Sequence, residues 1–401
     1  MKVRSFFAFS AGILFLSGCG RAEPAELTLW GGKQSTELLQ GQAEAFMAEN
    51  KDINVTVGIE DEDTLKDTVL GNPAGAADVF CFPNDQLADL ARAGMLSEIT
   101  EGKEAVTEAN GGEESAAVQS AMYEGKLYAY PMTASNGYFM FYDSSYFTEE
   151  DVKSLDKMLE IAAANDKYVM MDMTSGWYMY SFFAGAGMSV QMNEEGINEC
   201  DFNRTDGEVT GVQVAEAVLA IASHPGFKCG SDEDFQKGVE DGSVIAGING
   251  TWNVPVVEAA FGDGYAAAKL PEYTAAGKSL QMGSFAGYKL VGVSSGSKNK
   301  NAAHKLAAYI TGGDRQLERF AATGEGPSDT YAAASEEVQG APAIKALSEQ
   351  APYAKLQNIN NSYWEPMVSF GNVICTGNPD GLDLQTLLDD TVSAITADPS
   401  K

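Results

Sequence analysis

Three short stretches decide the fold: ELTLW at residues 26–30, INVTVGI at 53–59 and DVFCF at 78–82. The first two alternate polar and apolar residues and the third is almost continuously apolar, as is typical of β-strands. Between them, apolar residues recur near the helical period over 38–47, and a second helical stretch covers 65–70. This β-α-β-α-β order predicts a parallel sheet with helices on both faces.

The loops that follow these strands are candidate ligand contacts. Ligands of open parallel sheets bind beyond the carboxyl ends of the strands, where the loops 32–34 and 83–86 are expected. Further strands are predicted at 138–142, 168–171 and 244–248, with helices between and after them. The pattern therefore continues into a second α/β unit.

Composition limits the functions that the chain can have. Its 401 residues are enough for two or three domains. Because 44% of them are hydrophobic, the chain is not disordered throughout. Its 26 basic and 57 acidic residues give a net charge of −31, so a nucleic acid would be repelled. Only two histidines are present and no C-x-x-C pattern occurs, so neither a metal site nor a cofactor is expected.

The N-terminal segment is expected to be a signal peptide over residues 1–18. Two basic residues precede an apolar run, 6–16, that is too short to span a bilayer. The run ends in Leu16-Ser17-Gly18-Cys19, which resembles a bacterial lipobox. The resemblance implies that Cys19 is lipidated and that residues 19–25 form a tether. The protein would then be held by lipid at the extracellular face of the cell membrane.

Four cysteines follow Cys19. Cys200 and Cys229 lie in one loop-rich region, and an exported location permits disulfides, so a bond between these two is a candidate that the sequence leaves open. Cys81 lies in the apolar stretch 78–82 and is expected to be a buried thiol.

A family resemblance rests on the order of several motifs. GYKLVGVSSGSK at 287–298 is a strand that leads into a turn, and NAAHKLAAYIT at 301–311 continues as a helix. Thr323-Gly324 follows, and Asn249-Gly250-Thr251-Trp252 and Tyr130-Pro131 come earlier in the chain. Together with the lipobox, this order resembles the extracellular solute-binding proteins of ABC importers, in the maltose/maltodextrin-binding branch. The resemblance covers essentially the whole mature chain.

The resemblance implies an α/β, two-lobed fold of the periplasmic-binding-protein type, in which each lobe is a sheet flanked by helices and a hinge joins the lobes. The N-terminal lobe would comprise residues 26–132 and 287–326, and the C-terminal lobe residues 133–286 and 327–401. The chain would cross between the lobes near 132–136, 283–287 and 326–329. The protein would be a monomer that closes on an oligosaccharide and delivers it to an ABC permease.

Three tryptophans are the leading candidates for sugar contact. A sugar site needs flat aromatic surfaces for the C–H faces of the rings, and carboxylates, amides or cations for the hydroxyl groups. Trp177, Trp252 and Trp364 each lie at a turn-rich end of an expected element, which is an unusual place for core aromatic residues. Packing in a core or an interface is the alternative for each. By resemblance, all three match sugar-stacking positions of the second lobe.

The remaining contacts follow from the resemblance. Some members of the branch carry glutamate or arginine near positions where this chain has Asn136, Ser175 and Gln86, and these departures remove charge from the rim of the site. The other implied ligand contacts are Phe82, Asp85, Lys33, Gln34 and Tyr178.

Other functions find less support. Gly292-Val293-Ser294-Ser295-Gly296 fits the G-x-S-x-G nucleophile motif, but the only later histidine, His304, is too close in sequence for a triad. A glycoside hydrolase with a carboxylate pair stays open as an alternative, because 57 acidic residues make pairs inevitable and no spacing singles one out. A binding protein for a different sugar class also stays open, whereas an adhesin would not explain the tryptophans. The protein is expected not to be an enzyme.

Overall fold

The structure is a computed structural model that describes residues 24–397, except residues 63 and 194. The predicted signal peptide and the predicted lipidation site, Cys19, lie outside these residues. Within the described chain, we find no helix with the length and apolar character needed to cross a membrane.

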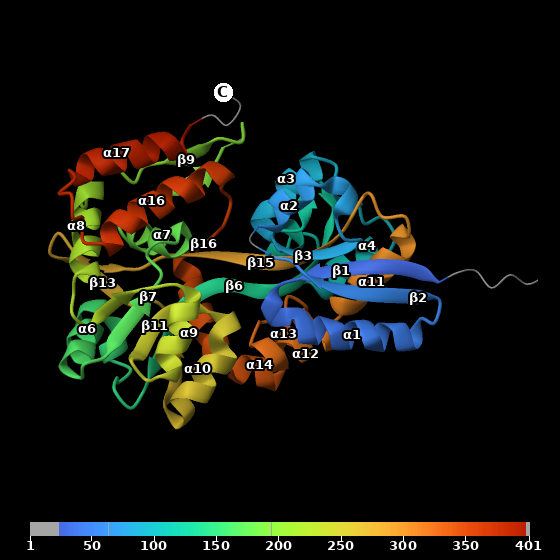
Figure 1. Ribbon diagram of the computed structural model, residues 1–401, viewed down its shortest axis with the longest axis horizontal. Helices are drawn as coiled ribbons and strands as arrows, with labels where there is room; N and C mark the ends of the chain where they lie inside the picture. The colour runs from blue at the N-terminus through green and yellow to red at the C-terminus, as the bar shows by residue number, and fades with distance from the viewer. Residues whose placement is uncertain (1–23, 63, 194, 398–401) are drawn as a thin grey trace, which may run out of the picture.

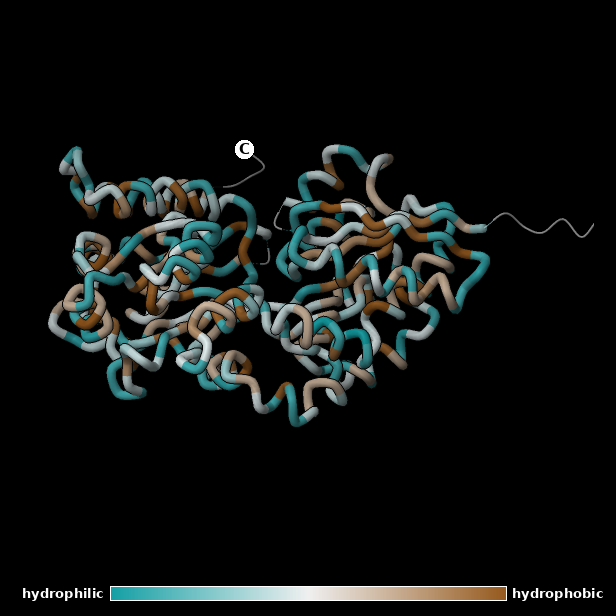
Figure 2. The backbone as a smooth tube through the Cα atoms, turned by 60° about the horizontal axis from the view of Figure 1, so that its bottom comes forward, coloured by the Kyte–Doolittle hydropathy of each residue, from teal (hydrophilic) through white to brown (hydrophobic). Residues whose placement is uncertain are grey.

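Two lobes share one mixed sheet of ten strands in the order β10-β7-β11-β6-β15-β3-β1-β2, with β12 paired to β6 and β16 paired to β15. Two long antiparallel neighbours, β6 (Ala129–Asp143) and β15 (Ser284–Val293), run from one lobe into the other. Figure 1 shows these two strands crossing the middle of the molecule, and Figure 2 shows the two lobes joined at this neck. The predicted two-lobed α/β architecture is therefore present.

The N-terminal lobe follows the β-α-β-α-β order predicted from the first stretch of sequence. Its strands β1, β2 and β3 are parallel, and β15 lies antiparallel between β3 and β6. Its elements are β1 (Ala25–Gly31), α1 (Thr36–Glu49), β2 (Ile53–Ile59), α2 (Leu65–Gly71), β3 (Val79–Pro83), α3 (Leu87–Arg92), α4 (Lys103–Ala109), α5 (Ala116–Gln119), β4 (Met122–Tyr123), β5 (Lys126–Leu127), α11 (Lys300–Ile310) and α12 (Gly313–Thr323).

The C-terminal lobe is built around β6, β7, β10 and β11, with β7 parallel to both β10 and β11. Its strands are β7 (Tyr168–Met171), β8 (Val190–Met192), β9 (Asn198–Cys200), β10 (Phe227–Cys229), β11 (Val244–Gly250), β12 (Tyr265–Ala268), β13 (Glu272–Ala275), β14 (Lys278–Gln281) and β16 (Ala354–Leu356). Its helices are α6 (Leu155–Ala164), α7 (Gly176–Gly185), α8 (Gly211–Ala222), α9 (Asp232–Glu240), α10 (Val254–Phe261), α15 (Pro342–Gln350), α16 (Trp364–Cys375) and α17 (Leu384–Ile395). The short helices α13 (Thr330–Ala333), which packs against α12, and α14 (Glu336–Gly340) connect α12 to α15.

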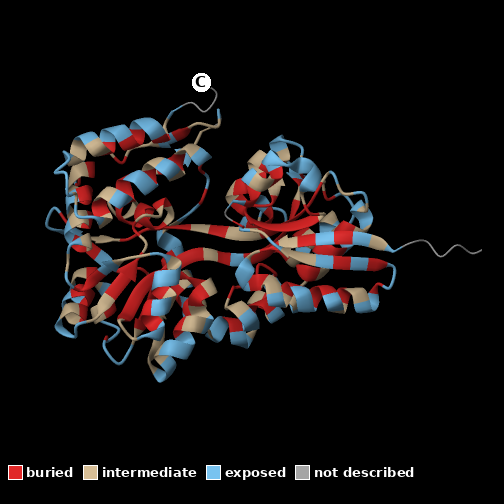
Figure 3. Cartoon of the chain, viewed as in Figure 1, coloured by how far each residue is buried: buried red, intermediate tan, exposed pale blue. Residues whose placement is uncertain are grey.

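Each lobe has its own hydrophobic core. The N-terminal core uses residues 27–132 together with 290–310, while the main C-terminal core uses 138–285 together with 359–395. Alternation along β6 supplies both faces of the C-terminal sheet, because Tyr138, Met140 and Tyr142 enter one core and Phe139 and Phe141 enter a smaller one on the other face. In Figure 3 the strands in the middle of the sheet are mostly buried, whereas β1, β2 and the outer faces of the helices carry exposed residues.

The segments between the two cores contain the predicted hinge. Residues 132–136 and 283–287 fall within or next to β6 and β15. The Gly326 amide donates to Ser135 Oγ at 2.7 Å, and the Ala134 amide donates to the Gly326 carbonyl at 2.9 Å, so the third predicted crossover lies beside the first. The exact lobe limits remain a prediction.

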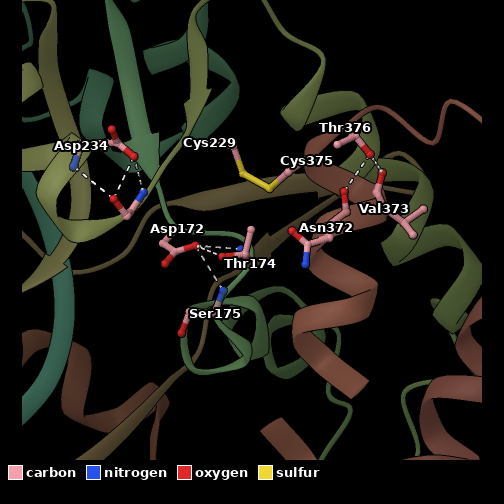
Figure 4. The surroundings of a disulfide bond; sticks show 10 residues. Asp172, Thr174, Ser175, Cys229, Asp234, Asn372, Val373, Cys375 and Thr376 are labelled. Atoms are coloured by element: carbon pink, nitrogen blue, oxygen red, sulfur yellow. Dashed lines mark hydrogen bonds between the residues drawn. A yellow bond between two sulfur atoms is a disulfide. The ribbon is translucent and has the colours of Figure 1, made fainter. Parts of the chain in front are cut away.

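One disulfide joins Cys229, at the end of β10, to Cys375, at the end of α16, with 6.0 Å between the Cα atoms (Figure 4). The predicted pairing of Cys229 with Cys200 is therefore wrong. Cys200 is a free, partly buried thiol at the end of β9, and burial raises its pKa to about 12. The fold brings Cys229 to a residue 146 positions away in sequence. Cys81 is a buried free thiol, as predicted.

Candidate ligand-binding site

Three loops at the carboxyl ends of the parallel strands form the N-terminal side of the candidate site. The first, residues 32–35, follows β1 and exposes Lys33 and Gln34. The second, which includes residues 60–62, follows β2, and the third, 84–86, follows β3 and carries the half-buried Asp85. This is the edge of the sheet at which open α/β folds bind ligands.

Phe82 does not contribute to this surface. Its side chain has 0% exposure and belongs to the N-terminal core, where its ring lies 5.8 Å from that of Phe80. All five residues of β3 are buried, because the strand is covered on both faces. The predicted ligand contact at Phe82 is therefore wrong.

An aromatic cluster marks the corresponding position in the C-terminal lobe. Trp177 lies in the first turn of α7, and Trp252 lies in the 3-10 turn Thr251–Asn253 directly after β11. Their ring centroids are 5.7 Å apart, and both side chains are half-buried against the core. The rings of Tyr138 and Tyr178 lie 4.6 and 5.2 Å from that of Trp177. The structure thus brings together two of the three predicted indoles and Tyr178.

Asp232 orients this cluster, and sequence reasoning missed it. Its Oδ1 atom accepts hydrogen bonds from Trp252 Nε1 at 3.3 Å, Asn249 Nδ2 at 3.0 Å and Asn253 Nδ2 at 2.5 Å. Tyr178 donates to Asn249 Oδ1 at 3.1 Å, which joins the tyrosine to the same network. An aspartate that accepts several hydrogen bonds fixes its donors strongly, because charged acceptors form stronger bonds than neutral ones.

The acidic sequence around Asp232 is typical of a solvated turn, but only part of this segment is one. Ser231 and Asp234 do form an exposed capping box at the start of α9. Such a box is recognisable from a serine followed three residues later by an acidic residue. Nothing in the local pattern indicates that the carboxylate between them faces inward.

The first turn of α7 is fixed by a second aspartate. Asp172 Oδ1 accepts from the Thr174 amide at 2.9 Å and the Ser175 amide at 3.3 Å, as Figure 4 shows. Ser175 is half-buried at the N-cap of α7. This turn therefore places Ser175, a predicted ligand contact, directly before the helix that carries Trp177.

Trp364 begins α16 and lies 5.1 Å from the ring of Tyr363. The Tyr363 hydroxyl donates to the Gly176 carbonyl at 2.7 Å, so the starts of α16 and α7 are joined. Asn136, also a predicted contact, lies half-buried on β6 opposite Gly287, where the chain passes between the lobes.

A direct contact spans the two lobes next to Trp364. Lys66 of α2 donates to Asn361 Oδ1 at 2.6 Å and forms an ion pair with Asp89 at 3.0 Å. Figure 1 shows that the start of α16 lies beside α2, so the Trp364 end of the helix faces the N-terminal lobe. Neither Lys66 nor Asn361 was predicted, because no local pattern relates residues so distant in sequence.

Three buried charged residues and the partly buried Lys289 lie behind the first two N-terminal loops. Lys289 Nζ is 3.0 Å from Glu62 Oε2 and 2.7 Å from Glu325 Oε1, and Arg319 Nη1 is 3.0 Å from Glu325 Oε2. Burial raises the pKa of Glu325, but Lys289 and Arg319 outweigh it and lower the pKa to about 2. Burial lowers the pKa of Lys289, and the two glutamates raise it above its usual range.

The alternative nucleophile motif does not form a triad. His304 Nδ1 is 3.0 Å from the Tyr130 hydroxyl and His304 Nε2 is 3.0 Å from Ser97 Oγ, so both ring nitrogens are engaged away from Ser294. Ser294 Oγ instead accepts from the Gly296 amide at 3.2 Å. The described residues also contain no cluster of side chains suited to a metal ion.

Comparison with known proteins agrees with this geometry. The chain is 26% identical to a galactooligosaccharide-binding protein of Bacillus subtilis (strain 168), over 94% of this chain and 93% of that protein. A structure solved with acarbose is 28% identical, with a TM-score of 0.82, covering 93% of this chain and 99% of that one. The maltodextrin-binding protein MalE1 from L. casei BL23, solved without ligand, is 25% identical, with a TM-score of 0.76, covering 94% and 100%.

The family match extends over residues 41–346, which is most of the chain. The protein belongs to the bacterial extracellular solute-binding protein family, whose members here are binding proteins and not enzymes.

Proposed function

We propose that this protein binds an oligosaccharide between its lobes. The indoles of Trp177 and Trp252 would stack on the sugar rings, and the loops 32–35 and 84–86 would contact the hydroxyl groups. The observation that carries the proposal is the half-buried pair of indoles at 5.7 Å, with Trp252 held by Asp232. Trp364 would complete the stacking surface at the interlobe contact.

Maltodextrins are the sugar class that we propose first. Support comes from the likeness to a maltodextrin-binding protein and to a structure solved with acarbose. A galactooligosaccharide is the second candidate, because the Bacillus subtilis relative is named for that class at a similar identity. The two candidates share the aromatic surface and differ in the hydroxyl groups that the rim must recognise.

We also propose a place for the protein in transport. The lobes would comprise 26–132 with 287–326, and 133–286 with 327–401. A lipid on Cys19 would hold the monomeric protein at the outer face of the membrane. Closure of the lobes on the sugar would give the form that the subunits of an ABC permease recognise.

Calorimetry tests the ligand proposal. Titration with maltotriose, maltotetraose and a galactosyl oligosaccharide should give affinity near the micromolar range, about −8 kcal/mol, for one class. The sugar should be recovered unchanged, because a hydrolase would consume it. Trp252→Ala should weaken binding, whereas Tyr331→Ala, which removes an aromatic ring that is 78% exposed elsewhere, should not. Silence toward both classes, or turnover of either, contradicts the proposal.

The lipid anchor is tested separately. A Cys19→Ser variant should move from the membrane fraction to the medium, and mass spectrometry of the wild-type N-terminus should show a diacylglyceryl group on Cys19. Wild-type protein without that mass contradicts the anchor and leaves the sugar site untouched.

A further inference from the structure

The first N-terminal loop, residues 32–35, is held at both of its ends by buried charges. At one end, the Gly32 amide donates to Glu62 Oε1 at 3.1 Å. At the other end, Arg319 Nη1 donates to Ser35 Oγ at 3.2 Å. Lys33 and Gln34, the two exposed residues, lie between these fixed points.

Lys289 and Glu325 join the two fixed points into one network. Lys289 bridges the free oxygen of Glu62 to Glu325, and Glu325 in turn pairs with Arg319. Because Glu62 and Glu325 are balanced by Lys289 and Arg319, the network is neutral. It is also buried, since Arg319 and Glu325 are only 1% and 3% exposed. We call Glu62, Lys289, Arg319 and Glu325 the loop clamp.

Stability alone is a poor explanation for the loop clamp. Buried ion pairs lose much of their attraction to the cost of removing both charges from water, and apolar replacements are often as stable. Arg319 adds to that cost, because its Nε and Nη2 atoms are buried without a hydrogen-bond partner among the described residues. What the charges provide is a defined geometry for the backbone at Gly32 and the hydroxyl of Ser35.

The loop clamp also reaches the predicted hinge. Glu325 directly precedes Gly326, whose amide and carbonyl are bonded to Ser135 and Ala134 on β6. Lys289 itself lies on β15, the other strand that runs between the lobes, and its amide donates to Thr133 Oγ1 at 3.4 Å. The position of the loop is therefore connected to both crossing strands.

We propose that Lys289 is a positioning residue for the sugar site, which sets the affinity for ligand by fixing the loop 32–35 without touching the sugar. This inference rests on the proposed function, because it assumes that Lys33 and Gln34 meet the ligand. It assigns a role to a partly buried lysine that is not among the predicted sugar contacts.

Lys289→Met tests the inference with two measurements on the full chain. Hydrogen exchange of peptides that contain residues 32–35 should accelerate, while peptides from α17 should keep their wild-type protection. Calorimetry with the oligosaccharide that wild type binds should show affinity lower by roughly tenfold, the equivalent of about 1.4 kcal/mol. Lys167→Met is the matched control, because Lys167 is a partly buried lysine of the C-terminal lobe, bonded to the Gly242 carbonyl.

A milder variant covers the case in which Lys289→Met does not fold. Glu62→Gln keeps an acceptor for the Gly32 amide but removes the charge that faces Lys289, so it should weaken affinity in the same direction by a smaller factor. Wild-type affinity with wild-type exchange in a folded variant overturns the loop clamp. Faster exchange with unchanged affinity overturns the positioning role. If the wild-type protein binds no sugar, the proposed function is refuted, and so is the role of Lys289 in sugar binding.

Discussion

Reduction of the Cys229–Cys375 disulfide should destabilise the C-terminal lobe strongly. The bond links the end of β10, the last strand of the sheet on this side, to the end of α16. Between these two cysteines the chain forms β11, leaves for the N-terminal lobe through β15, and returns through α13, α14 and α15. The bond therefore closes a loop that includes parts of both lobes.

The size of the effect follows from the length of this loop. For a sequence separation of 146 residues, the loss of chain entropy in the unfolded state corresponds to about 5 kcal/mol at room temperature. Measured values are usually smaller, so a loss of roughly 2–5 kcal/mol on reduction is expected. Since a folded domain is typically stable by only about 5–15 kcal/mol, the reduced protein should unfold at clearly lower urea concentration.

Urea unfolding with and without reductant measures this loss, and Cys229→Ser should reproduce the reduced curve without reductant. Cys200→Ala is the control, because Cys200 is a free thiol and its removal should leave the response to reductant intact. Peptide mapping of the oxidised protein should find Cys229 linked to Cys375. Coincident unfolding curves for oxidised and reduced protein, or a peptide that links Cys200 to Cys229, would refute the reasoning.

Three other perturbations probe the site and its supports. Asp232→Ala removes the acceptor of the Trp252 indole, a charged hydrogen bond of about 1.5–3 kcal/mol, so calorimetry should give weaker sugar binding, and unchanged affinity would contradict the orienting role. In the folded protein, Lys289 and Arg319 lower the pKa of the Glu325 carboxyl from 4.5 to about 2. The ionised carboxylate therefore stabilises the folded state fully above the ordinary carboxyl pKa, and this contribution is lost as the pH falls toward 2. Urea midpoints measured against pH should therefore decline over that range less steeply in Glu325→Gln than in wild type. Lys66→Met breaks the contact with Asn361, and X-ray scattering should then show a larger radius of gyration without ligand; identical curves would show that the contact does not hold the lobes together.

The strands were predictable because their patterns are local. The alternation in 26–30 and 53–59 and the apolar run in 78–82 correspond to β1, β2 and β3, and the later strands at 168–171 and 244–248 correspond to β7 and β11. Alternation in β1 and β2 comes from the burial of alternate side chains, whereas the continuous apolar runs in β3 and β11 come from burial on both faces. The division into two lobes, with the chain crossing between them near 132–136 and 283–287, was inferred from the family resemblance and not from a local pattern.

The site was predictable only where exposure follows from local sequence. Tryptophans next to turn residues at element ends were predicted as sugar contacts, and the structure brings two of them, Trp177 and Trp252, together as half-buried rings. Phe82 failed because a continuous apolar run already indicates a strand buried on both faces, and the resemblance was given priority over that signal. Asp232 and the true disulfide were missed because both depend on which distant segments the fold brings together.

The discontinuous construction of the N-terminal lobe constrains the order in which the chain can mature. Strand β15 separates β3 from β6, and α11 supplies core residues up to Ile310, so a nascent chain cannot complete its first lobe until the ribosome has made most of the second. A product truncated before Ser284 would leave the edges of β3 and β6 unpaired, and such edges recruit other chains into aggregates. Premature termination between β6 and Ser284 should therefore yield insoluble fragments instead of an independently folded first lobe.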